Sequence, residues 1–188
     1  AGLGQNQAGQ EYFKEPFTSG RTYISPVHFS PAAPGNVFYI GTPVLNPNNG
    51  AILGVLRVEI RASLFGDIIR EKNGAAGEGS YAILLDEYNL VLADPVNPEY
   101  ISHSVTALVP NQINLLRAQN RLPASLADDE ISLQMVSFAK GLSNIATTPH
   151  FTSTDRAFGE PMQVAAKYLD NQPWKIAFVQ PQTIALAP

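Results

Sequence analysis

The sequence predicts an α+β fold in which antiparallel sheets are flanked by helices. Residues 36–45 and 51–60 are two β-rich runs on either side of the turn sequence NPNNG at 46–50. Residues 80–86 and 89–95 form a second pair of apolar runs around another short turn. In the second half of the chain the order strand, strand, helices, strand, strand favours an antiparallel sheet with helices on one face.

The first half is predicted to contain a short aromatic strand around Tyr23, the hairpin just described and a helix at 61–73. The apolar side chains of that helix recur with a spacing that places them on one face. They are Leu64, Phe65, Ile68 and Ile69. Asn73 and Gly74 supply the signal at which the helix ends.

The hairpin of the second half begins after two glycines and reverses in a tight turn. Gly77 and Gly79 allow the backbone to turn into the first strand, because glycine tolerates positive φ. Residues 86–89, Asp-Glu-Tyr-Asn, then make the reversal between the two strands. We expect this glycine-led hairpin to open a small sheet of its own.

The remaining elements follow from periodicity and turn residues. Residues 111–122 are predicted to be helical, with core candidates Ile113, Leu115, Leu116 and Leu122. The segment 127–141 is expected to begin as a helix at Asp128 and to continue as extended chain, and 144–160 is expected to be mostly loop. The sequence closes with strands predicted at 161–169 and 174–181 and a helix that begins at Gln182.

Composition excludes several classes of function. The net charge is -4 and no basic run is present, so phosphate-driven binding to nucleic acid or to an anionic membrane surface is not expected. The absence of cysteine removes disulfides, thiolate nucleophiles and cysteine-based zinc sites. Neither a signal peptide nor a run of about 20 apolar residues is visible.

No catalytic, metal or cofactor motif stands out. The sequence has no G-x-S-x-G elbow and no phosphate-cradling glycine loop, so an enzyme is not expected. The three histidines are far apart and lack the spacing of metal ligands. The acidic run 128–130 lacks the alternating ligands and central glycine of a calcium loop, and it fits the first turn of a helix better.

Four segments, in order, resemble the double Cache sensor domain, an extracytoplasmic pair of PAS-like modules found in bacterial histidine kinases, chemoreceptors and diguanylate cyclases. The segments are YIGTPVLNPNNGAILGVLRVEI (39–60), LFGDIIREKNG (64–74), GEGSYAILLDEYNLVLADP (77–95) and QPWKIAFVQP (172–181). In the family, segments similar to these close the distal module, connect the two modules, open the proximal module and lead toward a transmembrane helix.

The resemblance implies a membrane-distal Cache module at 1–73, including the connecting helix 61–73, and a membrane-proximal PAS-like module at 74–188. The long first helix and early strands of the family's distal module are not found in this sequence. Either they were cut away, which would leave the distal module truncated, or this module is minimal.

The function implied by the resemblance is extracytoplasmic sensing of a small molecule by a bacterial transmembrane receptor, with a sensor histidine kinase as the expected type. The receptor would be tethered to the membrane, and a homodimer is expected from the family. A module that only spaces or dimerises its host, without binding a ligand, is the alternative.

The resemblance also suggests ligand-binding residues in the distal module: Tyr12, Tyr23, Tyr39 and Glu59. Members that bind amino acids carry an Arg-x-Trp-Tyr motif, and the matching residues 10–13, Gln-Glu-Tyr-Phe, lack the arginine that clamps a carboxylate. Glu59 stands where those members have an aspartate that binds the ligand ammonium group. Two alternatives remain open: Glu59 pairs with Arg57 or Arg61, and the tyrosines are ordinary core residues.

Candidates for a pocket in the proximal module are Tyr81, Asp94, Tyr168 and Trp174. Trp174 follows a proline, and core packing is the favoured interpretation for it. Aromatic side chains with a few polar groups are the usual lining of small-molecule sites.

Overall fold

The computed structural model describes residues 4, 6–29 and 35–187 of the chain. The chain separates into two compact units at the junction between Ala62 and Ser63. The first unit holds a four-stranded sheet and the second a five-stranded sheet, and all strand pairs are antiparallel. Helices flank both sheets, so the predicted α+β class is confirmed.

The first sheet is organised around β3 (Asn36–Leu45). β4 (Ile52–Arg61) pairs with one edge of β3 along its whole length, as the turn NPNNG predicts. The short strands β1 (Tyr23–Ile24) and β2 (His28–Phe29) pair with different parts of its other edge. One ten-residue strand therefore holds the other three in place.

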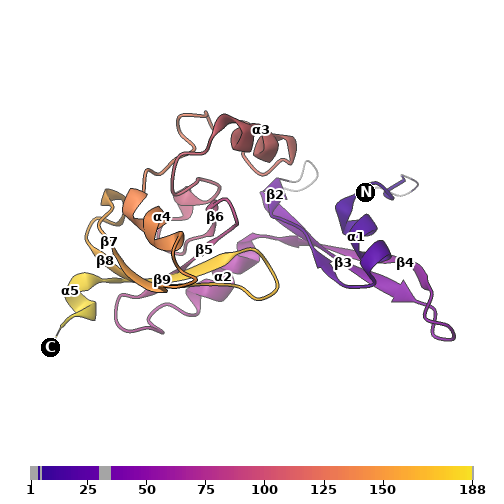
Figure 1. The fold of residues 1–188 in the computed structure, drawn as a ribbon, viewed down its shortest axis with the longest axis horizontal. Coiled ribbons are helices and arrows are strands. Elements are labelled where there is room, and N and C mark those ends of the chain that lie inside the picture. Colours follow the sequence, from indigo (N-terminus) through magenta and orange to yellow (C-terminus); the bar gives the residue numbers. More distant parts are fainter. Residues whose placement is uncertain (1–3, 5, 30–34, 188) are drawn as a thin grey trace. The chain divides into compact units, whose positions relative to one another are not determined.

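Helix α1 (Glu11–Ser19) was not predicted from the sequence, and it contains Pro16 in its interior. Pro16 has no N–H, so it cannot bond the carbonyl group of Tyr12 one turn earlier. That carbonyl oxygen lies against Gly41 of β3, where a β-carbon would collide with it. α1 therefore packs on the sheet through a glycine, as Figure 1 shows for the indigo helix beside β3 and β4.

The second sheet has the order β6-β5-β9-β8-β7. Its strands are β5 (Tyr81–Leu85), β6 (Val91–Ala93), β7 (His150–Ser153), β8 (Met162–Tyr168) and β9 (Lys175–Pro181). The last strand of the chain lies at the centre, because β9 pairs with β5 on one side and with β8 on the other. The predicted strand pairs at both ends of this unit are confirmed.

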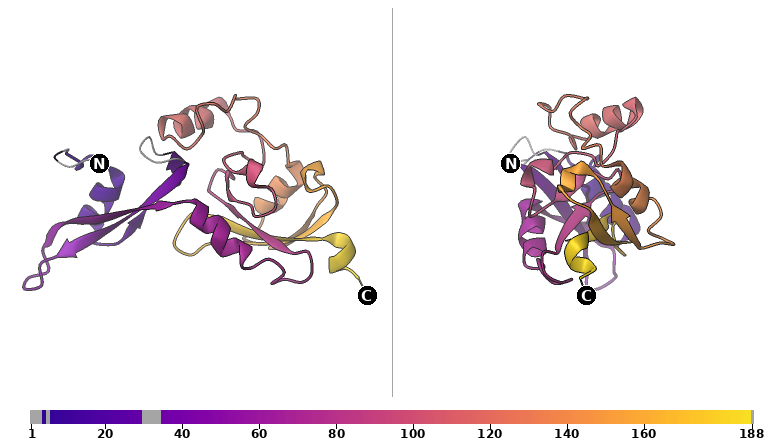
Figure 2. Two further views of the ribbon diagram at one scale, coloured as in Figure 1. Left: turned by 180° about the vertical axis from the view of Figure 1, so that it is seen from behind. Right: turned by 90° about the vertical axis from the view of Figure 1, so that its left-hand side faces the viewer.

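The helices of the second unit are α2 (Ser63–Arg70), α3 (Pro110–Ala118), α4 (Val136–Leu142) and α5 (Gln182–Ala185), with 3-10 turns η1 (Pro98–Tyr100) and η2 (Arg156–Phe158). Phe138 and Leu142 of α4 pack into the core on Ile83, Leu85 and Val179 of the sheet. α2 contacts β5 and β6 from the other face (Figure 2). Helices thus cover both faces of this sheet rather than the single face that we predicted.

One further prediction for the second unit is wrong. No helix begins at Asp128: the backbone of Ile131 and Leu133 bonds Ser104, and the helix α4 starts only at Val136. This long-range pairing holds the segment extended where local sequence favours a helix. Residues 144–160 are mostly loop, as expected, but they also contain the unpredicted strand β7, which pairs with β8 at the edge of the sheet.

A buried ion pair joins the β5–β6 turn to the segment after α3. Arg121 Nη2 donates to Asp86 Oδ2 at 2.7 Å, and both side chains are almost fully buried. Arg121 Nη1 donates to Glu87 at 2.7 Å, and Lys175 Nζ donates to Asn89 Oδ1 at 2.6 Å. The turn that opens the second sheet is thereby fixed from two distant parts of the chain.

Burial raises the pKa of the Asp86 carboxyl to about 6, although Arg121 and backbone amides act in the opposite direction. Burial likewise lowers the pKa of Lys175. Asp155 shows the contrary case. Burial raises its pKa, but hydrogen bonds from Ser137 and Phe138 at the start of α4 outweigh that effect, so its pKa is lowered.

Gly41→Ala should destabilise the first unit by about 2 kcal/mol, because the added methyl group would overlap the backbone carbonyl of Tyr12. Amide hydrogen exchange of β3 and β4 measures this local stability. Gly54→Ala on β4 is the matched control, since its methyl group would enter open space and should change the stability by less than about 0.5 kcal/mol. Equal effects of the two substitutions would contradict the packing of α1 on Gly41.

In a ¹³C NMR titration the Asp86 carboxyl should show a midpoint at about 6, above the ordinary 3.8. The Asp155 carboxyl should titrate below its ordinary value. Between pH 3.8 and about 6 the folded protein holds a proton on Asp86 that the unfolded chain has lost. The contribution of Asp86 to the free energy of unfolding therefore decreases as the pH rises through this window. A midpoint for Asp86 at or below 3.8 would show that Arg121 outweighs burial.

Candidate functional site

The four candidate residues of the first unit lie together. Directly paired residues of an antiparallel ladder share one face of the sheet, and alternate residues of a strand do so too. The pairs Tyr39↔Glu59, Gly41↔Arg57 and Tyr23↔Gly41 therefore place these side chains on one face. α1 packs on this face at Gly41, and it brings Tyr12 beside Tyr39.

We use the name tyrosine cluster for the group Tyr12, Tyr23, His28, Tyr39, Arg57 and Glu59. Tyr39 is at its centre: its ring centroid lies 4.9 Å from that of Tyr12 and 4.8 Å from that of His28. The Cζ atom of Arg57 lies 4.9 Å from the centroid of Tyr12 and 4.7 Å from that of Tyr39. Both distances are within the range of a cation–π interaction.

Carboxylates bind two of the three hydroxyl groups of the cluster, and the Tyr12 hydroxyl donates to the side-chain amide oxygen of Gln7. The Tyr23 hydroxyl donates to Glu11 Oε2 at 3.0 Å. Tyr39 forms a side-chain hydrogen bond with Glu59, and its pKa is raised first by burial and then by this bond and by the charge of Glu59. Arg57 acts in the opposite direction on the same pKa.

The ion pairs in the described part of the chain join other residues, so Glu59 has no ion pair with Arg57 or Arg61. Sequence reasoning treated Arg57 only as a partner for Glu59, and it did not place His28 in the site. The signal for Arg57 was its position two residues before Glu59 on the same strand. The contact with the rings depends on the register with β3 and on α1, and α1 was not predicted.

In the second unit two of the candidates are neighbours and two lie elsewhere. Tyr81 is buried in the core, and burial followed by the charge of Asp94 raises its pKa. Asp94 accepts hydrogen bonds from the amides of Val96 and Asn97, both at 2.9 Å, and so holds the turn after β6. Both groups are engaged in packing or in holding the backbone.

Tyr168 is 45% exposed and pairs with Lys175 at the start of β9. Tyr81 pairs with Val179, four residues further along the same strand, which is a separation of about 13 Å. Trp174 is buried, with its ring centroid 5.2 Å from that of Phe65 on α2. The structure therefore does not gather the second set of candidates into one site.

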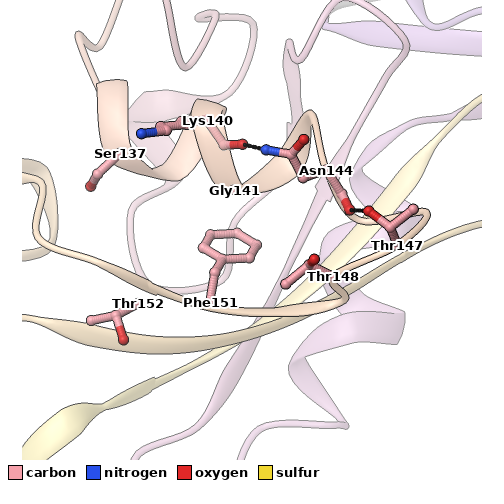
Figure 3. A pocket seen from close by; sticks show the side chains of 8 residues that line it. All are labelled: Ser137, Lys140, Gly141, Asn144, Thr147, Thr148, Phe151 and Thr152. Atoms are coloured by element: carbon pink, nitrogen blue, oxygen red, sulfur yellow. Dashed lines mark hydrogen bonds between the residues drawn. The ribbon is translucent and has the colours of Figure 1, made fainter.

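A cavity of about 420 Å³ lies between α4 and β7 (Figure 3). Its lining consists of Ser137, Lys140, Gly141, Asn144, Thr147, Thr148, Phe151 and Thr152. The ring of Phe151 reaches Gly141, where no β-carbon would fit. Five of the lining side chains carry a hydroxyl or amide group and Lys140 adds an ammonium group, although most of the exposed surface of the cavity is apolar. None of the residues proposed from the sequence takes part.

Among the described residues no three His, Asp or Glu side chains are grouped so that they could hold a metal ion. The described helices are also too short or too polar to span a membrane. The tyrosine cluster therefore offers aromatic faces, the imidazole ring of His28, the carboxylate of Glu59 and one guanidinium group, with Glu11 bonded at its edge.

No family model and no curated protein matches the sequence. Solved structures do match. The sensor domain of the V. cholerae histidine kinase DctB has a TM-score of 0.61 at 20% identity, and the match covers 95% of this chain and 62% of that one.

Two chemoreceptor domains give similar values. The ligand-binding domain of Pseudomonas fluorescens CtaA, in complex with L-alanine, has a TM-score of 0.57 at 13% identity and covers 98% of this chain and 65% of that one. The ligand-binding domain of Campylobacter jejuni Tlp3, in complex with 4-methylisoleucine, has a TM-score of 0.58 at 14% identity and covers 96% and 56%. This chain thus spans less than two thirds of the length of each. Over nearly all of its own length it has the fold of these sensor and ligand-binding domains, as the resemblance to double Cache domains predicted.

Proposed function

We propose that this chain is the extracytoplasmic small-molecule-sensing region of a bacterial transmembrane receptor. The observation that carries the proposal is the structural match, over 94% or more of this chain, to sensor domains of a histidine kinase and of chemoreceptors. Three of those chemoreceptor domains are complexes with L-alanine, 4-methylisoleucine or GABA. A ligand that binds one conformation better than another would shift the receptor toward it.

A sensor histidine kinase is the receptor type that we favour, and its support is the match to the sensor domain of the histidine kinase DctB. In this proposal residues 1–73 form a shortened membrane-distal module, whose connecting helix α2 packs within the second compact unit, and residues 74–188 form the membrane-proximal module. The full receptor would be tethered to the membrane and would work as a homodimer. The chain itself would carry no catalytic activity.

The tyrosine cluster is the proposed ligand site. Its support is the convergence of the four residues Tyr12, Tyr23, Tyr39 and Glu59, from three strands and one helix, on one face of the first sheet. Aromatic faces with a few polar groups suit a small organic ligand. Tyr81, Asp94 and Tyr168 are a weaker proposal, since the first two are engaged inside the fold and the third is remote from them.

A module without a ligand is the second candidate function. The observation in its favour is that Arg57 already lies over the rings of Tyr12 and Tyr39, so the chain satisfies its own cluster. Such a module would serve only to space or dimerise the receptor.

A thermal-shift screen of the chain with amino acids, short carboxylates, amines and sugars tests the proposal. A ligand that binds only the folded state at 100 times its dissociation constant adds about 2.7 kcal/mol, which is a clear rise in melting temperature. We expect Glu59→Gln to abolish the shift. Glu78→Gln, an exposed carboxylate in the other unit, is the matched control and should leave it unchanged. A shift that survives Glu59→Gln would exclude the tyrosine cluster as the site, and no shift at all would favour the module without a ligand.

A further inference from the structure

Arg57 is held in the tyrosine cluster by aromatic rings and not by an acid. Its guanidinium group faces two rings at once, at 4.9 Å and 4.7 Å from their centroids. In the described part of the chain no carboxylate lies within ion-pair distance of Arg57. A planar, weakly hydrated guanidinium group is suited to stacking on aromatic faces.

The surroundings of Arg57 favour positive charge. Glu59 is hydrogen-bonded to Tyr39, and Glu11 accepts a hydrogen bond from Tyr23 on the same side of the sheet. Neither carboxylate is neutralised by an ion pair among the described residues. Two rings and two carboxylates thus form a site for a cation, and the cation present is a side chain of the chain itself.

The side chain of Arg57 can also leave the two rings without disrupting the fold. Arg57 is an exposed residue of β4, so its side chain can swing into solvent without opening the core. Exposed cation–π contacts are weak compared with buried ion pairs. A soluble cation with a better fit can therefore replace it.

We propose that the tyrosine cluster binds an organic cation with a guanidinium or alkylammonium group, and that Arg57 occupies this site until such a ligand displaces it. The inference rests on the proposed function and adds the class of ligand and its regulation to it. A ligand with a free carboxylate is disfavoured because Glu11 and Glu59 would repel it. The cluster has no carboxylate clamp once Arg57 leaves.

Competition with Arg57 sets the ligand concentration to which the site responds. The apparent dissociation constant equals the intrinsic constant divided by the fraction of molecules in which the site is open. If Arg57 fills the site in about nine of ten molecules, its removal raises the apparent affinity about tenfold. An arginine in this position weakens the binding that it regulates.

Isothermal titration of the chain with agmatine and putrescine tests the proposal, with succinate as the anionic probe. Arg57→Gln should bind agmatine about tenfold more tightly than the wild type, and Arg57→Lys, which keeps the charge but loses the planar group, should lie between the two. The double substitution Arg57→Gln/Glu59→Gln should lose binding. Arg61→Gln removes the same charge four residues away on the same strand, and it should change the affinity less than twofold.

An NMR measurement on the unsubstituted chain provides a second test. The guanidinium group of Arg57 lies near two aromatic rings, which shift its Nε–H resonance. When agmatine displaces the Arg57 side chain, this resonance should move toward the chemical shift of a solvent-exposed arginine. No movement on saturation with agmatine would overturn the displacement.

The possible failures are distinguishable. If succinate or an amino acid binds and Arg57→Gln weakens that binding, the cation site is wrong while small-molecule sensing stands. If cations bind but Arg57→Gln leaves their affinity unchanged, the regulation by Arg57 is wrong. If neither the wild type nor a folded Arg57→Gln variant binds any probe or any compound of the thermal-shift panel, both the inference and the proposed function fail.

Discussion

The contact between the backbone of α1 and Gly41 is the constraint on which the first unit depends. Pro16 leaves the carbonyl group of Tyr12 without its usual partner in the helix, and the missing side chain at residue 41 lets that carbonyl approach the sheet. The approach sets the height of Tyr12 above β3. The edge-to-face contact with Tyr39 and the position of Arg57 over both rings follow from it. The contact between the Tyr12 carbonyl group and Gly41 thus positions the aromatic rings of the tyrosine cluster.

The second unit depends instead on contacts between residues that are far apart in the chain. β9 lies between β5 and β8, although β5 is nearly a hundred residues earlier in sequence. The ion pair between Asp86 and Arg121 spans 35 residues, and Lys175 reaches the same turn from β9. Buried ions need such partners because an unpaired charge inside a protein is costly. Asp86, Arg121 and Lys175 can be buried in this unit because each of them has a polar or charged partner there.

Local signals were sufficient for some elements. The turn NPNNG lies between two β-rich runs and predicts that β3 pairs with β4. The register shifts by one residue between Val44 and Leu45, so the turn alone would pair Tyr39 with Val58, and its pairing with Glu59 depends on that irregularity. Periodicity located α2 and α3, but it was only partly right about which side chains are buried: Ile69 and Leu116 are buried, whereas Leu64, Ile68 and the core candidate Leu115 are exposed. The helix α1 was missed because it contains a proline, and its packing depends on a glycine 25 residues after Pro16. The start of α4 was misplaced because Ser104 holds Ile131 and Leu133 in an extended conformation. The stacking of Arg57 on Tyr12 and Tyr39 depends on the register of β3 with β4 and on the position of α1, so it could not be predicted from the sequence.

The end of β9 connects the second sheet directly to α5. The strand passes into α5 without a connecting loop, since Pro181 is its last residue and Gln182 is the first of the helix. The amide of Gln182 is bonded to the carbonyl group of Pro161 beside β8, which ties the junction to the neighbouring strand as well. A central strand cannot tilt without its two neighbours, and here no flexible joint would absorb such a tilt. A change in the twist of the sheet at β9 would therefore move the first turn of α5 together with the end of the strand.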